Sequence, residues 1–408
     1  MSTTTTTAQP APTPGSDPGK RRIPKLNINL RQYGILAALA IIIILFQVMT
    51  NGRLLLPGNV NNLIQQNAYV LILAIGMVIV IIAGHIDLSV GSVVAMVGAV
   101  SAISMNSWGF PWWAAVILAL VVGAVVGAWQ GFWVAYVGIP AFIVTLAGML
   151  IFRGLTLVLL TGGTISGLPA EFTAIGAGWV PGFLGEVGGR DLLTIVLGVL
   201  TVVVLVAQGL RTRRTLHKLD LPREPMASFW IKNGIAAVAI LAFTWLLSDY
   251  SGTPIILIIL AVLILLYTFL LNRSVFGRHV YAMGGNLFAA VMSGVKTKRV
   301  NFLIFVNMGI LAGLAGVVST ARAGGAVASA GQNYELDAIA AVFIGGAAVQ
   351  GGVGTVVGAV IGGLVMGVLN MGLSILSVDA AWQMAIKGFV LLLAVAFDIF
   401  NKRRAGGR

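Results

Sequence analysis

The sequence predicts an all-α fold, a polytopic bundle of about twelve transmembrane helices. Hydrophobic residues make up 58% of the chain, charged residues only 9%, and the mean hydropathy is +1.00. A chain of this length with so few polar residues cannot coat a water-soluble globule. Many apolar segments run for about 17–25 residues, which an α-helix needs to cross a hydrocarbon core about 30 Å thick. The 52 glycines and 13 methionines are typical of helices that pack closely in lipid.

Residues 33–400 are predicted to form one transmembrane domain. The apolar segments that define its spans lie at 33–50, 67–83, 88–105, 113–137, 141–160, 191–208, 233–248, 255–271, 300–320, 338–350, 354–377 and 384–400. The segment 338–350 is short for a full crossing. We therefore expect it to be re-entrant, or a half-length helix enclosed by protein.

The distribution of lysine and arginine predicts the orientation. Twenty of the 25 lie in four regions, the tail 1–32, the loops 209–232 and 272–299, and the tail 401–408. With twelve crossings these regions share one face, which the positive-inside rule assigns to the cytoplasm. The loop 161–190 then faces the periplasm. The net charge of +13 is explained by topology, so we expect no nucleic-acid partner.

The N-terminal tail 1–32 is predicted to be disordered, because residues 1–19 are rich in Thr, Pro, Ser and Gly and contain no apolar run. No pattern in the chain indicates catalysis. It has no cysteine, its three histidines (His85, His217 and His279) are scattered, and it has no phosphate-loop motif. We therefore expect no catalytic, metal or cofactor site in this chain. If ATP drives its activity, the ATPase is a separate polypeptide.

Glycine recurs every fourth residue in two predicted spans, at Gly123, Gly127 and Gly131 and again at Gly354, Gly358 and Gly362. This spacing places the glycines on one stripe of a helix, where a second backbone can approach closely. Tight packing within the chain is the plainer interpretation. A translocation path or a contact with a second copy is the alternative.

Four motifs carry a resemblance to a known family. They are Gly284-Gly285-Asn286 with Ala289-Ala290 and Ser293-Gly294, then Gly84 to Ser92, then Pro140 to Leu146 with Arg153-Gly154, and finally Tyr334 to Ala341. Together they resemble ribose/xylose-type monosaccharide permeases of ABC transporters. The family usually has glycine where this chain has His85. The region 209–254 makes the chain similar to the longer xylose or multiple-monosaccharide type.

The resemblance implies the permease subunit of an ATP-driven importer in the bacterial cytoplasmic (inner) membrane, with both termini in the cytoplasm. It implies four partners: an ABC ATPase that uses ATP and Mg, a periplasmic or lipid-anchored sugar-binding protein, a second copy of the permease, and a monosaccharide substrate, with xylose favoured. An ion-coupled secondary sugar transporter is the alternative. Such carriers usually bury acids near the midplane, whereas this chain's acids are predicted at span ends or in loops.

The resemblance assigns ATPase coupling to a motif in the 277–295 loop, with an ordinary cytoplasmic connector as the alternative. The coupling candidates are Gly284, Gly285, Asn286, Ala289, Ala290, Ser293 and Gly294. Their small side chains suit a short helix that docks in a groove of another protein.

Five further residues are candidates for a gate or the substrate pathway, namely Asp87, Ser89, Arg153, Glu335 and Asp337. Asp87 also suits a helix N-cap. Arg153 falls inside a span, where we expect it to snorkel or to pair with an interior carbonyl or acid. Glu335 and Asp337 are expected near the outer face, where they cap a helix or contact a partner.

Two smaller expectations concern the outer interface. Lys387 is expected there as an anchor. Trp108, Trp112 and Trp113 are expected to form an aromatic belt rather than a sugar-stacking surface.

Overall fold

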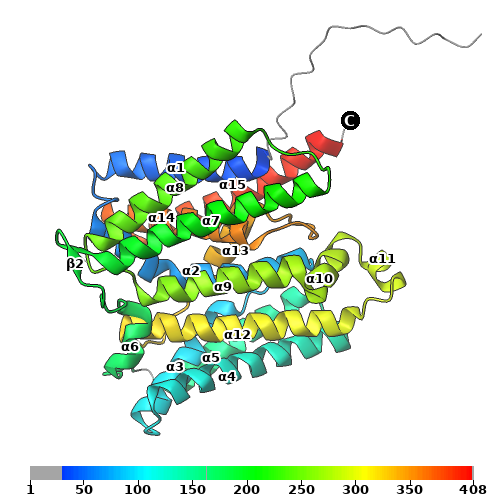
Figure 1. Ribbon diagram of the computed structural model, residues 1–408. Coiled ribbons are helices and arrows are strands. Elements are labelled where there is room, and N and C mark those ends of the chain that lie inside the picture. Colours follow the sequence, from blue (N-terminus) through cyan, green and yellow to red (C-terminus); the bar gives the residue numbers. More distant parts are fainter. Residues whose placement is uncertain (1–29, 162, 407–408) are drawn as a thin grey trace, which may run out of the picture.

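The computed structural model describes residues 30–161 and 163–406, which form one bundle of helices lying side by side (Figure 1). In this part of the chain, eight helical segments are long and apolar enough to cross a membrane. They are α2 (Pro57–Ile82), α4 (Trp112–Phe132) with its π-helical continuation η1 (Trp133–Val137), α5 (Ala141–Leu160), α7 (Leu192–Lys218), α8 (Met226–Ser248), α9 (Ile255–Arg273), α12 (Thr297–Ala323) and α14 (Val356–Ile375).

Shorter apolar stretches lie within α1 (Leu30–Met49), α3 (Val90–Asn106) and α15 (Ala380–Gly406). Each predicted span overlaps a helix, so the polytopic bundle is confirmed. The segment expected to be half-length is α13 (Tyr334–Ile344), an 11-residue helix that begins and ends earlier than predicted.

The expected loop 161–190 carries structure of its own. It contains α6 (Ala170–Ala177), β1 (Ile165–Ser166) and β2 (Glu186–Val187). Strand β2 pairs with β3 (Arg190–Asp191), and β1 pairs antiparallel with β4 (Gly325–Ala326), with Ile165 opposite Ala326. The β1–β4 pair therefore ties this segment to the chain that follows α12.

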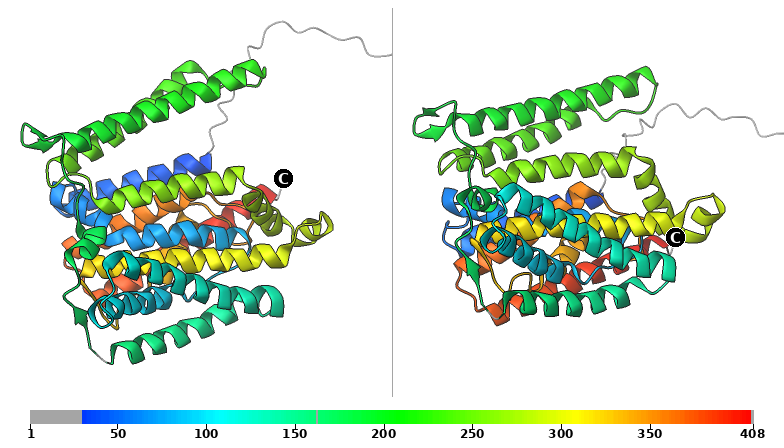
Figure 2. Two further views of the ribbon diagram at one scale, coloured as in Figure 1. Left: turned by 60° about the horizontal axis from the view of Figure 1, so that its bottom comes forward. Right: turned by 90° about the horizontal axis from the view of Figure 1, so that it is seen from below.

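The basic regions gather at one end of the bundle. The start of α1, the α7–α8 connection, the helices α10 (Val275–Gly285) and α11 (Leu287–Met292), and the end of α15 all lie there, opposite α6 and β2 (Figures 1 and 2). Helices α7 and α8 extend into the expected 209–232 loop, and α15 extends into the expected tail as far as Gly406. Most of the N-terminal tail, residues 1–29, lies outside the described residues.

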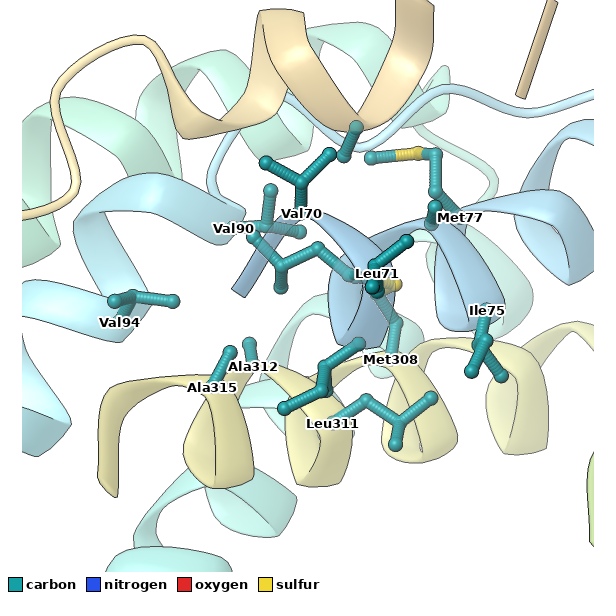
Figure 3. Close-up of a cluster of buried hydrophobic side chains, with 14 of the residues drawn as sticks. Val70, Leu71, Ile75, Met77, Val90, Val94, Met308, Leu311, Ala312 and Ala315 are labelled. Carbon is teal, nitrogen blue, oxygen red and sulfur yellow. The ribbon is translucent and has the colours of Figure 1, made fainter. Parts of the chain in front are cut away.

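Helix α2 forms the centre of the bundle and is almost entirely buried. Figure 3 shows Val70, Leu71 and Ile75 of α2 beside Met308 and Leu311 of α12. In a membrane, a helix that is apolar on all sides can face either lipid or other helices. The equally apolar helices α7 and α9 are mostly exposed, so the central position of α2 comes from its contacts and not from its apolar run alone.

The glycine stripes pack within the chain, as the plainer interpretation predicted. A Cβ added at Gly123 would collide with the carbonyl of Gly309 in α12, and one at Gly127 with that of Phe305. In α14, the same addition at Gly358 or Gly362 would collide with backbone of the α13 region. These glycines therefore face neighbouring helices of the same chain, and neither stripe is free to contact a second copy.

Helices α7 and α8 form a peripheral hairpin that splays away from the rest of the bundle (Figure 2). At the end near β2, the guanidinium of Arg190 lies 3.0 Å from Asp249 and 4.2 Å from the ring centroid of Trp245. This hairpin corresponds to the additional region noted in the sequence.

Candidate functional site

Helix α13 begins deep inside the bundle rather than at its surface. Its first residue, Tyr334, stacks on Tyr69 with ring centroids 3.5 Å apart and planes inclined by 15°. Tyr69 lies near the middle of the 26-residue α2. After α12 the chain therefore turns back into the bundle through residues 324–333 and starts α13 near mid-depth. The preceding Asn333 has a left-handed conformation, with φ of 63°.

This depth corrects the expectation for Glu335 and Asp337. They do not lie near the outer membrane surface, because α13 starts beside the middle of α2. Asp337 is 2% exposed; its Oδ2 accepts a hydrogen bond from the Tyr69 hydroxyl at 3.0 Å. The Nζ of Lys387, in α15, lies 3.2 Å from each Asp337 oxygen. Lys387 is therefore one half of an interior ion pair, and the expectation that it is an interfacial anchor was wrong. This pair joins α13 to α15.

Arg153 pairs with interior carbonyls, one of the outcomes expected for it. Its Nη1 donates to the carbonyls of Ala328 and Ala330, at 3.0 and 2.7 Å. Because a helix rises about 1.5 Å per residue, Arg153 lies about 10 Å inside the end of α5 at Leu160. It therefore holds the re-entrant segment 324–333 in place from the side.

Asp87 and Ser89 form a buried turn between α2 and α3. The Oδ1 of Asp87 accepts hydrogen bonds from the backbone N–H of Ser89 at 2.9 Å and from its hydroxyl at 2.6 Å. The amide of Gln130 in α4 donates to the same hydroxyl. Asp87 accepts a backbone N–H at the start of α3, as expected, but the residue that directly precedes the helix is Ser89, so Asp87 is not itself the N-cap. Asp87 instead fixes the turn.

His85 does not distort this turn. The left-handed residue is Gly84, with φ of 83°, and His85 is not among the residues with positive φ. Its Nε2 lies 3.1 Å from the Oδ1 of Asn301 in α12. A side chain larger than glycine is therefore compatible with this position.

Two cavities flank the start of α13. The first, about 290 Å³, is lined by polar side chains of α2, α12 and α13, including Gln65, Tyr69, Ser319, Arg322 and Tyr334. The second, about 330 Å³, is lined by Ser92, Met149, Leu150, Arg153, Gln332, Asn333 and Glu335. We call the second the lateral cavity. The sequence-predicted residues Arg153 and Glu335 meet there, whereas Asp87 and Ser89 lie outside its lining.

The motif residues of the α10–α11 segment determine its shape. The Oδ1 of Asn286 caps α11 by accepting from the N–H of Ala289 at 2.9 Å, and Gly294 follows with φ of 80°. Ala290 is 4% exposed and faces its own chain. A Cβ at Gly284 would collide with the carbonyl of Ile82, whereas one at Gly285 would meet open space.

The exposed surface of α11 is apolar. Phe288 is 73% and Met292 69% exposed, and Leu287 and Val291 lie beside them, also exposed. The sequence motif did not single out these four residues, because motif comparison selects the residues that shape the turn. The pattern that could have identified them is a group of large apolar residues within a short basic loop.

Side chains missed in the sequence include Tyr69 and Gln130. Each is a polar residue within an otherwise apolar span, and this pattern could have identified both as candidates for the site. No group of three or more acidic or histidine residues placed to hold a metal occurs in the described part of the chain.

Comparison with known proteins identifies the family. Residues 59–395 match the family described as the branched-chain amino acid transport system permease component. The chain belongs to this family. No solved structure matches it.

Curated relatives of this permease are sugar transporters by name. This chain is 43% identical to the xylose transport system permease protein XylH of Haemophilus influenzae, over 93% of this chain and 98% of that protein. It is 39% identical to the Escherichia coli K12 protein of the same name, over 93% and 94%. The Bacillus subtilis ribose import permease protein RbsC is 35% identical, over 90% and 93%.

These matches confirm the resemblance drawn from the motifs. The chain is the permease component of a transport system and crosses the membrane several times. The alternative of an ion-coupled carrier gains no support from these relatives.

Proposed function

We propose that this permease is the membrane-spanning subunit of an ATP-driven importer that carries xylose, or a related pentose or hexose, across the bacterial inner membrane. The observation that carries the proposal is the 43% identity with a xylose permease across 98% of that protein's length. No other curated relative named above combines such identity with such coverage.

The α10–α11 segment is the proposed docking site for the ATPase, which binds ATP and Mg. A short helix with Leu287, Phe288, Val291 and Met292 exposed suits a groove on another protein. The basic residues near this segment, Arg273, Arg278, Lys296, Lys298 and Arg299, favour a cytoplasmic location. The same rule puts both chain termini in the cytoplasm.

Motion of the docked segment reaches the interior through backbone contacts. Gly284 packs against Ile82 at the end of α2, and the N–H of Gly352 donates to the same Ile82 carbonyl at 2.8 Å. The hydroxyl of Tyr281 in α10 donates to the carbonyl of Gly354 at 2.7 Å. Residues 345–355 connect α13 to α14, so a shift of α10 displaces the C-terminal end of α13. The other end of α13 carries Tyr334 and Glu335.

On the opposite side, a periplasmic or lipid-anchored binding protein would deliver the sugar to the end of the bundle that carries α6 and β2. A homodimer of permeases would alternate the access of a central path. Polar groups beside the start of a broken helix at mid-depth are typical of substrate sites in transporters. Arg153, Glu335 and Asp337 supply such groups here, and Asp87 with Ser89 fixes the turn beside them.

Uptake by reconstituted vesicles tests the proposal. The permease would be reconstituted with its ATPase in the lumen, and with its binding protein and radiolabelled xylose outside. We expect uptake that requires enclosed ATP and Mg and is unaffected by ionophores. Uptake driven by a proton or sodium gradient without the ATPase would contradict the proposal and favour an ion-coupled carrier.

A further inference from the structure

Helix α7 carries a stripe of exposed residues that changes from apolar to basic along its length. Residues spaced three or four apart share one face of a helix. On one face of α7 the exposed residues at this spacing are first apolar, namely Val196, Leu200, Val203 and Ala207. The same face then continues with three exposed cations, Arg211, Arg214 and Lys218. We call these residues the α7 stripe.

The opposite face of α7 packs against α8. A Cβ added at Gly198 would collide with Thr244 of α8, and one at Gly209 with the ring of Phe229. The guanidinium of Arg213 lies 5.1 Å from the centroid of the same ring. The hairpin splays away from the rest of the bundle (Figure 2). Since the stripe residues are also exposed, nothing in the described part of the chain covers the α7 stripe.

The three cations lie at the depth of lipid headgroups. Trp230, next to Phe229, is 49% exposed, and exposed tryptophans are typical of the boundary between hydrocarbon and headgroups. Phe229 meets α7 at Gly209 and Arg213, so Arg211 lies level with this boundary. Because a helix rises about 1.5 Å per residue, Lys218 lies about 10 Å further out. The headgroup layer on each side of a bilayer is about 5–8 Å thick, so the cations extend through it.

The chain does not neutralise these cations. Two acids lie nearby, Asp220 and Glu224, and Glu224 pairs with Lys232 at 3.0 Å. In the part of the chain that the structure describes, no residue of the α7 stripe forms an ion pair. The positive-inside rule explains why cations gather at this end, but not why three of them continue one apolar face. A ligand with an anionic head and an apolar tail matches both parts of the stripe.

The apolar part of the stripe favours lipid over protein as that ligand. Val196 lies 15 residues before Arg211, which places it about 22 Å deeper along the helix. The ATPase, like any soluble partner, does not reach hydrocarbon at that depth, whereas acyl chains already fill it. An anionic headgroup is in turn attracted by each Lys or Arg beside the membrane surface.

We propose that the α7 stripe binds an anionic phospholipid of the inner leaflet. The headgroup phosphate lies on Arg211, Arg214 and Lys218, and an acyl chain lies along the apolar residues. The lipid thereby fastens the splayed hairpin to the surrounding leaflet. This site does not depend on which sugar the permease carries, and its leaflet follows from the orientation proposed above.

Native mass spectrometry of the purified full-length permease tests the site. Dioleoyl phosphatidylglycerol is titrated into the protein in neutral detergent, with dioleoyl phosphatidylcholine as the zwitterionic comparison. We expect phosphatidylglycerol to bind more tightly. Its affinity should fall by roughly tenfold to a hundredfold in the triple variant Arg211→Gln, Arg214→Gln, Lys218→Gln.

A matched control removes the same charge at the same end of the bundle. It is the triple variant Lys296→Gln, Lys298→Gln, Arg299→Gln, at exposed positions before and at the start of α12. It should bind phosphatidylglycerol as the unmodified permease does. Arg211→Lys with Arg214→Lys keeps the charges and should also retain binding, which separates a loss of charge from damage to the fold.

Three results would overturn the site. Equal losses of affinity in the two triple variants would show a general attraction of charge. Binding of glycerol phosphate, which lacks acyl chains, as tightly as the lipid would show that the apolar residues contribute nothing. Loss of the ATPase from the α7 triple variant, with phosphatidylglycerol binding unchanged, would assign the cations to a protein contact instead.

Discussion

Gly284 of α10 packs against the carbonyl of Ile82, and Gly352, which follows α13, donates its N–H to that same carbonyl. Three segments far apart in the sequence thus meet at one backbone oxygen. The contact joins the proposed ATPase-docking segment to both the central helix and the half-length helix. It explains why a residue without a side chain stands at position 284.

Substitution of Gly284 tests this contact. Gly284→Ala places a Cβ against the Ile82 carbonyl, so the α10–α11 segment must shift away from α2 and α13. We expect normal membrane insertion and a loss of xylose uptake of at least about tenfold, equivalent to about 1.4 kcal/mol. The neighbouring Gly285→Ala is the matched control, because a Cβ there meets no atom within 4 Å. Equal uptake by both variants would show that the contact does not transmit motion.

The exposed apolar residues of α11, rather than the motif residues, should govern docking of the ATPase. Phe288→Asp introduces a charge at a position 73% exposed, so we expect a stable permease that no longer co-purifies with its ATPase. Leu219→Asp, 62% exposed in the α7–α8 connection at the same end of the bundle, is the control. Retention of the ATPase by Phe288→Asp, or its loss with Leu219→Asp, would place the docking surface elsewhere.

Ala290 illustrates the difference between shaping a segment and forming its surface. Ala290→Arg replaces a residue that is 4% exposed, so the arginine must displace the chain's own packing. We expect transport to be lost and the melting temperature to fall, whereas Phe288→Asp should lose transport with an unchanged melting temperature. Thermal unfolding of both variants in detergent separates the two effects.

The buried Asp337–Lys387 pair should be costly to break from one side. Asp337→Asn or Lys387→Met leaves one charge without its partner, which costs about 3–5 kcal/mol in buried pairs. The double variant removes both charges and should be closer to the unmodified permease. Lys232→Met, in the exposed pair with Glu224, should cost no more than about 1 kcal/mol. Thermal unfolding of all four variants measures these differences, and additive losses in the double variant would contradict a coupled pair.

Hydropathy predicted the membrane spans because the length of an apolar segment is a local property. The glycine stripe of α4 likewise predicted close packing, and α12 provides the opposing backbone at Gly309 and Phe305. Neither signal reveals which element a helix meets. For that reason the partner of each stripe came only from the structure.

The depth of α13 could not be predicted in the same way. Residues 324–333 look like an ordinary loop, and nothing local shows that Arg153 holds this segment inside the bundle through the carbonyls of Ala328 and Ala330. As a result, Glu335, Asp337 and Lys387 were assigned to the outer face. Asp337 contacts Tyr69, 268 residues away, and Lys387, 50 residues away. Such long-range contacts of single polar side chains leave no periodic pattern.

Packing against Gly127 offers a test of the fold itself. Gly127→Ala forces α4 away from Phe305 of α12, so we expect a clear loss of stability, about 1–3 kcal/mol as for other overpacked contacts. At Gly234 of α8, where nothing lies within 4 Å, the same change should be neutral or slightly stabilising. Similar melting temperatures for the two variants would contradict the close approach of α4 and α12.

The proposed function requires that the α10–α11 segment face the cytoplasm, where an ATPase can reach it. A single cysteine at Phe288 measures this with a membrane-impermeant maleimide, using Phe183→Cys, 76% exposed near β2, as the control for the opposite end. We predict that the cysteine at position 288 is unlabelled in spheroplasts, labelled in inside-out vesicles, and protected there by the ATPase, while position 183 shows the reverse sidedness. Labelling of position 288 from outside intact spheroplasts would contradict the proposed docking of an ATPase at this segment.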